Sequence, residues 1–194
     1  MFQACNELEY LDLSKFNTQN VKEISYMFNE CLKLKEIKGI NNFNSINVSN
    51  MNSMFQCCKE LEYLDLTNFD TSKVTEMNCM FNKCYKLKEI KGINNFITIN
   101  VTNMRRMFAD CNELVNLDLS NFNTSKVTDM SYMFYKCFKL KEIKGIYNFR
   151  ISDMTDLYKM FDECNDLEYI DISKFNSNSQ LISKIINREL IKDN

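Results

Sequence analysis

One pattern recurs from the first residue to about residue 175, and this repeat constrains the fold more than any other feature of the chain. A Met-Phe pair returns at alternating intervals of 26 and 27 residues, so two units together span 53 residues. A period of roughly 20–50 residues is typical of a solenoid, whose units bury their apolar faces only against neighbouring units. We therefore predict one solenoid domain at residues 1–175, with seven coils that begin at Met1, Met27, Met54, Met80, Met107, Met133 and Met160.

The first half of each unit predicts a β-strand. In the third unit, Leu61, Leu64 and Leu66 form an L-x-x-L-x-L pattern. Tyr63 directly precedes Leu64, and Asp65 lies between Leu64 and Leu66. Alternation of apolar and polar residues over a short stretch is typical of a half-buried strand. Strands of successive units should pair in parallel, about 4.8 Å apart.

The second half of each unit predicts a short helix, so the expected class is α/β with strand-turn-helix coils. Asp70, Thr71 and Ser72 precede the run and are all able to cap it, and the sequence does not choose between them. A helix is about 10 Å wide, which should splay the helical side and place a parallel sheet on the concave face. The apolar residues at helical spacing are Val74, Met77, Met80, Phe81 and Cys84.

Residues 61–81 read LEYLDLTNFDTSKVTEMNCMF, and this segment resembles the repeat of BspA-like leucine-rich repeat surface proteins, which also occurs in mycoplasma surface lipoproteins. The resemblance covers the chain to about Phe175. It implies a leucine-rich-repeat solenoid and a protein at the cell surface or secreted that binds other proteins. It brings no catalytic residues.

Two rows of side chains should share the outer, concave face of the strands, because residues two apart point to the same side. The rows could serve only strand register and solubility, or could form a protein-binding face, since tyrosine is favoured at interfaces. The first row alternates in sign and holds Asp12, Lys38, Asp65, Lys91, Asp118, Lys144 and Asp171. The second row holds Tyr10, Glu36, Tyr63, Glu89, Asn116, Glu142 and Tyr169.

The alternating row predicts that each acid lies between two lysines of neighbouring strands. Asp65 should contact both Lys38 and Lys91, and Asp118 should contact both Lys91 and Lys144. Opposite charges on adjacent strands contribute about 0.2–1 kcal/mol per pair, whereas like charges oppose pairing.

Cysteine occurs once per unit at one position, which continues the apolar stripe of the predicted helix. We expect a row of buried thiols there, since free cysteine behaves as a small apolar residue. Cys57 and Cys79 lie off this stripe and are the better candidates for reactive thiols. No C-x-x-C pair or histidine is present, so no metal site or cofactor is expected. The regular positions are Cys5, Cys31, Cys58, Cys84, Cys111, Cys137 and Cys164.

The three glycines, Gly39, Gly92 and Gly145, each follow the strand of an even-numbered unit. The next strand comes 27 rather than 26 residues later, and glycine with one extra residue is typical of a β-bulge. We interpret these glycines as bulges that tolerate an extra residue at the strand end, rather than as ligand contacts.

Enzymatic activity is not expected, because the chain has no histidine and no glycine-rich phosphate loop. Asp65 and Asp118 could lie roughly 9–10 Å apart, a spacing known in inverting glycosidases, but Lys91 should lie between them. A net charge of −2 without a basic stripe argues against nucleic acid as a partner. The sequence shows neither a transmembrane segment nor a signal peptide.

The two ends of the repeat carry separate predictions. No unit precedes the first strand, so Leu8, Leu11 and Leu13 should be less covered than their counterparts, and self-association through this coil is expected. At the other end, residues 176–194 predict an amphipathic helix that caps the last coil, with docking of a partner as the alternative.

The pattern therefore favours a non-catalytic protein-recognition scaffold, in which a cell-surface adhesion or interaction module uses the concave sheet to bind a protein ligand. The alternative is an intracellular or self-assembling structural scaffold. A start at Met1 would favour the intracellular form, whereas a secretion signal ahead of it would favour the surface form.

Overall fold

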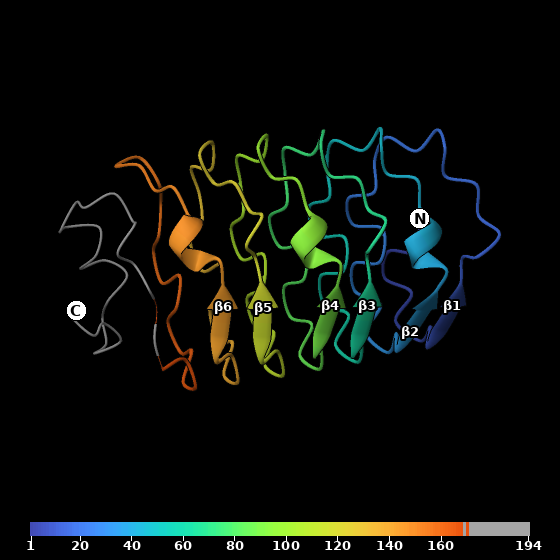
Figure 1. Ribbon diagram of the computed structural model, residues 1–194. Coiled ribbons are helices and arrows are strands. Elements are labelled where there is room, and N and C mark those ends of the chain that lie inside the picture. Colours follow the sequence, from blue (N-terminus) through green and yellow to red (C-terminus); the bar gives the residue numbers. More distant parts are fainter. Residues whose placement is uncertain (169, 171–194) are drawn as a thin grey trace.

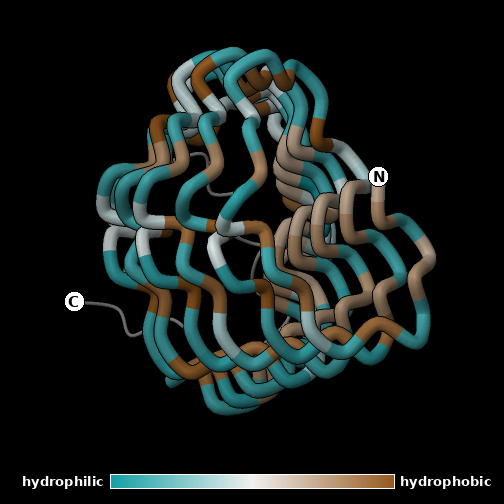
Figure 2. The backbone as a smooth tube through the Cα atoms, turned by 90° about the vertical axis from the view of Figure 1, so that its right-hand side faces the viewer, coloured by the Kyte–Doolittle hydropathy of each residue, from teal (hydrophilic) through white to brown (hydrophobic). Residues whose placement is uncertain are grey.

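The computed structural model describes residues 1–168 and 170, and in it successive coils of the chain stack side by side (Figure 1). A view along the stack shows the coils one behind another around a shared interior (Figure 2). The leucine, isoleucine, methionine, phenylalanine and cysteine side chains of the repeat form one continuous core cluster in this interior. Tyr169, Asp171 and the predicted capping helix at residues 176–194 lie outside the described residues.

Within the described residues, six three-residue strands lie on one side of the stack (Figure 1). They pair in parallel as three couples, β1 with β2, β3 with β4 and β5 with β6, at a sequence offset of 26 residues. In each couple the central leucine faces an isoleucine, as Leu64 does with Ile90. The strands are β1 (Tyr10–Asp12), β2 (Glu36–Lys38), β3 (Tyr63–Asp65), β4 (Glu89–Lys91), β5 (Asn116–Asp118) and β6 (Glu142–Lys144).

Each even-numbered strand is followed by a glycine and one turn of 3-10 helix, not by a strand bulge. Gly92 has φ of 84°, in the left-handed region, and a Cβ there would lie 2.4 Å from the Cα of Thr67 in the preceding coil. Glycine is therefore required for its backbone conformation and for the close approach of two coils, which corrects the expectation of a tolerated extra residue. The 3-10 turns are η1 (Ile40–Asn42), η2 (Ile93–Asn95) and η3 (Ile146–Asn148).

The predicted helices are wrong: the described residues contain no α-helix, and the segment at residues 74–84 is a series of tight turns. Its amides bond largely to the next coil, as Phe81 N–H does to the Met107 carbonyl at 2.9 Å and Lys83 N–H to the Ala109 carbonyl at 2.8 Å. The helix width that was expected to curve the stack is therefore absent from the described residues. We call this hydrogen-bonded series of turns the turn ladder.

The turn ladder reproduces the side-chain spacing of a helix with a different backbone. The Cys84 N–H donates to the Phe81 carbonyl and the Leu87 N–H to the Cys84 carbonyl, both at 3.1 Å, so each turn advances the chain by three residues. All three side chains are fully buried. Apolar residues at intervals of three and four therefore face the core in either structure, which explains the wrong prediction.

The residues proposed as helix caps have other partners. The carboxylate of Asp70 accepts the N–H of Ser72 at 2.9 Å, which is a local turn. The buried hydroxyl of Thr71 accepts the Ile97 N–H at 2.7 Å and donates to the Ile97 carbonyl at 3.0 Å. Thr71 therefore joins two coils and does not begin a helix.

A second set of single-residue parallel bridges runs at the start of the turn ladder, and unlike the strand pairs it is unbroken from the first coil to the sixth. Five of the six bridging side chains accept the N–H two residues later, as Asp129 does from Ser131 at 2.8 Å, whereas Glu76 accepts the Thr102 hydroxyl at 3.2 Å. These bridges join Glu23, Asn50, Glu76, Asn103, Asp129 and Asp156 in sequence.

Thirteen non-glycine residues of the described chain have a positive φ, between 53° and 62°, and they lie in the turn ladder. The left-handed region costs an L-amino acid roughly 1–2 kcal/mol, and more for a β-branched side chain. None of the thirteen is valine, isoleucine or threonine, which agrees with this cost. They are Ala4, Tyr26, Glu30, Ser53, Cys57, Cys79, Lys83, Arg106, Asp110, Tyr132, Lys136, Lys159 and Glu163.

Phenylalanine rings stack through the core, one from each coil. Adjacent ring centroids are 5.3–5.8 Å apart and adjacent planes differ by 1–12°. Such stacking adds to the free energy of burying each ring. The stack consists of Phe2, Phe28, Phe55, Phe81, Phe108, Phe134 and Phe161.

The predicted row of buried thiols is confirmed for six of its seven members, from Cys31 to Cys164. Each of the six donates to the carbonyl of the stacked phenylalanine in the preceding coil, at 3.0–3.2 Å. The prediction is wrong for Cys5, which is exposed, since no described coil packs over it on that side. Cys57 and Cys79 are half-buried, and burial raises the pKa of both thiols, which disfavours the reactive thiolate.

The first coil is less covered than the others, as predicted, although not at every position. Leu8 and Leu11 are half-buried, whereas Leu61 and Leu64 in the third coil are buried. The same expectation is wrong for Leu13, which is 1% exposed because it packs within the core cluster.

The left-handed positions can be tested at Lys83. Lys83→Val should lower the free energy of unfolding by roughly 1–3 kcal/mol, because a β-branched side chain fits the left-handed region poorly. Lys83→Asn should leave stability unchanged or raise it, since asparagine tolerates this conformation. Urea unfolding of both variants checks the prediction, and equal midpoints would contradict the assigned backbone.

Candidate functional site

The strand face presents the two rows of side chains that the sequence places outward. Tyr10 is 62% and Tyr63 45% exposed, while Leu64 between the two rows of the third coil is buried. The strand register sets Tyr10 opposite Glu36 and Tyr63 opposite Glu89. The alternation of outward and inward residues along each strand is therefore as predicted.

The acids of the alternating row pair with lysines within couples but not between them. Asp65 lies 3.2 Å from Lys91, and Asp12–Lys38 and Asp118–Lys144 are each 3.3 Å apart. Within the described residues, Asp65 forms no ion pair with Lys38, and Asp118 forms none with Lys91, contrary to the expectation. The glycine turn and 3-10 helix that follow each even strand interrupt the hydrogen-bonded ladder there, so the next acid has no paired strand on that side.

A further set of ion pairs at the entrance to the strands was missed in the sequence. They link a glutamate of an odd coil to the lysine 26 residues later, at 2.5–2.7 Å. The matching E-x-E and K-x-K segments were visible at this offset and could have predicted them. The pairs are Glu7–Lys33, Glu9–Lys35, Glu60–Lys86, Glu62–Lys88 and Glu113–Lys139.

Within the described residues, each aspartate of the alternating row also accepts hydrogen bonds from the residue two positions later, just beyond the end of its own strand. One carboxylate oxygen of Asp65 accepts the Thr67 N–H at 3.1 Å and the Thr67 hydroxyl at 2.5 Å, while the other faces Lys91. The pKa of Asp65 is lowered first by the hydroxyl of Thr67 and further by Lys91. The same arrangement lowers the pKa of Asp12 to about 2, chiefly through hydrogen bonds from Ser14.

The strand face thus carries three Asp–Lys pairs and exposed tyrosines, and the glutamates of its second row make it acidic. Glu36, Glu89, Asn116 and Glu142 are exposed on it as predicted. A shallow cavity of about 260 Å³ lies over β1 and β2, where Tyr10, Leu11, Asp12, Glu36 and Lys38 line it.

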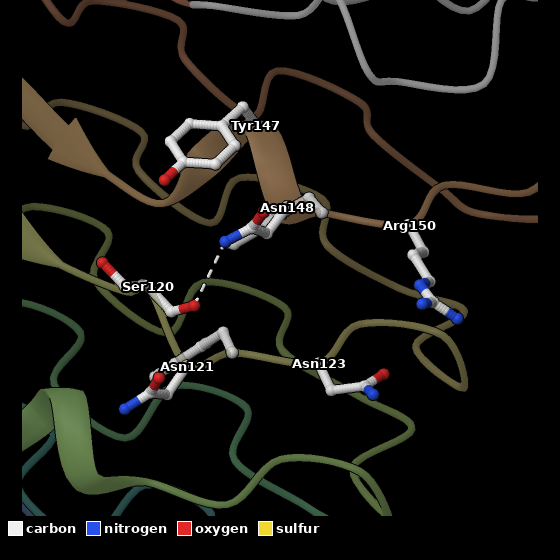
Figure 3. A pocket seen from close by; sticks show the side chains of 8 residues that line it. Ser120, Asn121, Asn123, Tyr147, Asn148 and Arg150 are labelled. Carbon is white, nitrogen blue, oxygen red and sulfur yellow. Dashed lines mark hydrogen bonds between the residues drawn. The ribbon is translucent and has the colours of Figure 1, made fainter.

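A larger cavity, of about 610 Å³, opens between the fifth and sixth coils just beyond the ends of β5 and β6 (Figure 3). The Asn148 side-chain amide crosses between the two coils and donates to the Ser120 carbonyl at 3.2 Å. This cavity was not predicted, because its walls come from segments about 26 residues apart. The polar residues that line it are Ser120, Asn121, Asn123, Tyr147, Asn148 and Arg150.

A cluster of aromatic and cationic side chains over the turn ladder was also missed. Tyr132 lies under Arg106 at 4.6 Å and Arg105 at 5.3 Å, and the rings of Tyr135 and Tyr158 meet it edge-on at 5.5 and 5.3 Å. Of the other coils only the first repeats one of these residues, with Tyr26 at the place of Tyr132, so the repeat alone gave no signal. Cation–π contacts at exposed sites contribute about 0.5–1 kcal/mol each.

Within residues 1–168 and 170, no three histidine, cysteine or acidic side chains gather as metal ligands would. Over the same residues, no helix has both the length and the apolar character needed to cross a bilayer. The geometry of the described residues therefore offers two candidate binding features, the strand face and the cavity between coils five and six.

Comparison of the chain with models of protein families finds one family that matches it. A family model described as "Mycoplasma protein of unknown function, DUF285" matches residues 1–92 and again residues 87–188. The chain belongs to the DUF285 family. The two matches to this DUF285 chain together cover nearly its whole length.

Among solved structures, the DUF285 chain is similar to a crystal structure of a leucine-rich repeat protein from Bacteroides ovatus. The identity is 14% and the TM-score is 0.44, over 87% of this chain and 56% of the other. The DUF285 chain thus spans little more than half the length of that protein. Comparison with curated proteins finds no match.

The role of the aspartate row can be tested with Asp65→Asn, which keeps an acceptor for Thr67 but removes the charge facing Lys91. At pH 7 the variant should be less stable by about 0.2–1 kcal/mol. Because the folded pKa of Asp65 is lowered, its contribution exists above the unfolded pKa of about 3.9 and is lost as pH falls through the folded pKa.

The difference in unfolding free energy between parent and variant should therefore shrink as pH is lowered from 7 towards 3. Lys91→Gln is the matched control, because it removes the same ion pair and leaves the Asp65–Thr67 hydrogen bonds intact. A difference that stays constant with pH would show that the Asp65 charge does not stabilise the fold.

Proposed function

We propose that this chain is a non-catalytic protein-recognition scaffold that binds its ligand through the strand face. The observation that carries the proposal is the exposure of Tyr10 and Tyr63 beside a row of acids and lysines that already pair with one another. Tyrosine offers a large contact area with little loss of conformational freedom, and it is enriched at interfaces.

The internal pairing of charge bears on the kind of ligand. Asp12, Asp65 and Asp118 each face a lysine within the same couple, and the charged residues of the other row are all glutamates, so the face presents no row of basic residues. A polyanion such as nucleic acid requires a row of basic side chains. A protein surface that fits the tyrosines and meets the paired charges suits the face better.

The same geometry supports a non-catalytic role. Asp65 and Asp118 are each held as ionised carboxylates by hydrogen bonds and a lysine, which lower the pKa of both. A general acid needs a raised pKa, and neither group has one. The chain also contains no histidine to act as a base.

The location of this scaffold is part of the proposal. Similarity of the repeat to BspA-like leucine-rich repeat proteins supports a module at the cell surface or secreted, where it would act in adhesion. An intracellular scaffold is the alternative, and it draws support from the buried thiols of Cys31, Cys58, Cys84, Cys111 and Cys137, which form no disulfide within the described residues.

A self-assembling scaffold is the second candidate function, and the first coil supports it. Phe16 is 41% exposed, Leu8, Leu11 and Val21 are only partly buried, and the outer edge of β1 pairs with no described strand. Unpaired strand edges and partly covered apolar ends promote association. Stacking of a second copy on this coil would cover both.

Site-specific photocrosslinking distinguishes these functions. A benzophenone side chain is placed at Tyr63 on the strand face, at Tyr158 over the turn ladder, or at Phe16 on the first coil, and each protein is mixed with detergent-solubilised cell-surface proteins. Recognition by the strand face predicts a crosslinked partner from position 63 and none from 158. Unlabelled parent should compete, whereas unlabelled Tyr10→Ser/Tyr63→Ser should not.

A crosslinked dimer of the chain from position 16, without a partner from position 63, would favour self-assembly. Equal capture from positions 63 and 158 would contradict recognition by the strand face.

A further inference from the structure

The cavity between the fifth and sixth coils is walled by two short segments that follow paired strands. Ser120, Asn121 and Asn123 come after β5, and Tyr147 and Arg150 lie in and just after η3, which follows β6. In Figure 3 the Arg150 side chain extends from its coil towards the side on which Asn123 lies, and the Tyr147 ring stands over Ser120. The cavity is separate from the tyrosine and charge rows of the strand face.

The repeat supplies an internal comparison for this cavity. The place of Tyr147 is taken by Asn94 in the second couple, and the place of Arg150 by Ile97. In the first couple both places hold asparagine. The fold of the coils is the same with either set, so Tyr147 and Arg150 are not required for folding and alter only the chemistry of the cavity.

Arg150 is anchored by its backbone and leaves its side chain available. Its N–H donates to the buried hydroxyl of Thr124 at 2.7 Å, and its carbonyl accepts from the same hydroxyl at 3.0 Å. Within the described residues, its guanidinium makes no hydrogen bond or ion pair. A guanidinium offers a planar pair of donors that suits a carboxylate.

The asparagines around the cavity are oriented by bonds that use one end of each amide. Asn121 and Asn148 donate from Nδ2 to the carbonyls of Asn94 at 2.7 Å and Ser120 at 3.2 Å, so each keeps its Oδ1 as an acceptor. Asn123 instead uses Oδ1, which accepts the Ser125 N–H at 3.0 Å, and keeps its Nδ2 donors. Donors therefore gather at the Arg150 end and acceptors at the Asn121 and Asn148 end.

We propose that this cavity binds a carboxylate-bearing sugar. The carboxylate would meet Arg150 and the Asn123 amide, while ring hydroxyls would donate to the Oδ1 atoms of Asn121 and Asn148. The Tyr147 ring offers an apolar face to the sugar C–H groups. The volume is in the range of small-ligand sites, and a lining rich in fixed polar groups suits a ligand with many hydroxyls.

The corresponding corner of the second couple should not bind such a ligand. Asp70 stands in the place of Asn123, Ile97 in that of Arg150, and hydrogen bonds from Ser72 keep the Asp70 carboxylate ionised. An acid in this position repels a carboxylate ligand.

The first test is titration of the isotopically labelled protein with glucuronate, followed by the side-chain amide signals of Asn121, Asn123 and Asn148 in NMR spectra. We expect saturable shifts at these amides and binding at least about tenfold weaker for glucose, which lacks the carboxylate. Arg150→Ile and Tyr147→Asn should each weaken glucuronate binding by about tenfold or more. Both variants install the residue that the second couple carries at the equivalent place, Asn94 or Ile97. An unchanged midpoint of thermal unfolding would confirm that the variants fold.

The second test is a gain of binding. The triple variant Asp70→Asn/Asn94→Tyr/Ile97→Arg copies the site into the second couple, and the number of bound glucuronates should rise from one to two. Loss of glucuronate binding in Arg150→Ile, together with the second bound glucuronate in the triple variant, would assign binding to this cavity. The gain of binding keeps the test valid even if Arg150→Ile folds poorly.

Three outcomes would overturn the proposal. The first is the absence of saturable shifts with glucuronate. The second is acetate binding as tightly as glucuronate, because the cavity would then hold any carboxylate. The third is tighter binding of an oligoglutamate peptide at the same amides, which would make the ligand an acidic protein segment.

Discussion

Hydrogen bonds between successive coils in the turn ladder are the interaction on which the rest of the structure depends. The described strands join coils only in couples, whereas the bridges run unbroken from the first coil to the sixth and the hydrogen bonds of the turn ladder reach the seventh. Left-handed residues such as Lys83 make these bonds possible, because they turn every other N–H towards the next coil. The cost of this backbone is offset by bonds such as that from Lys83 to Ala109 and by the core that the turns enclose.

Much of the core could be predicted from the sequence, but the backbone of half of each coil could not. The repeat predicts which residues are buried, since Leu64, Phe81 and Cys84 point inward in any structure with this spacing. A helix and a chain of three-residue turns bury the same positions, so periodicity cannot separate them. The left-handed positions carry residues such as Cys79 and Lys83 instead of glycine, and so give no local signal.

The candidate site shows the same division. Exposure of the tyrosine row and pairing of Asp65 with Lys91 follow from strand alternation and from the 26-residue offset. The break between couples, which removes the contact with Lys38, depends on how the glycine turn leads into the next coil. The cavity could not be predicted because Asn121 and Arg150 come together only through the stacking of two coils.

The most direct test of this account is NMR detection of scalar couplings across hydrogen bonds, which identify the donor nitrogen and the acceptor carbonyl of each pair. The account predicts couplings from the Cys57 nitrogen to the Asn82 carbonyl and from the Lys83 nitrogen to the Ala109 carbonyl, both in the next coil. Couplings from these nitrogens to carbonyls four residues earlier would contradict it, because they would show α-helices in place of the turn ladder.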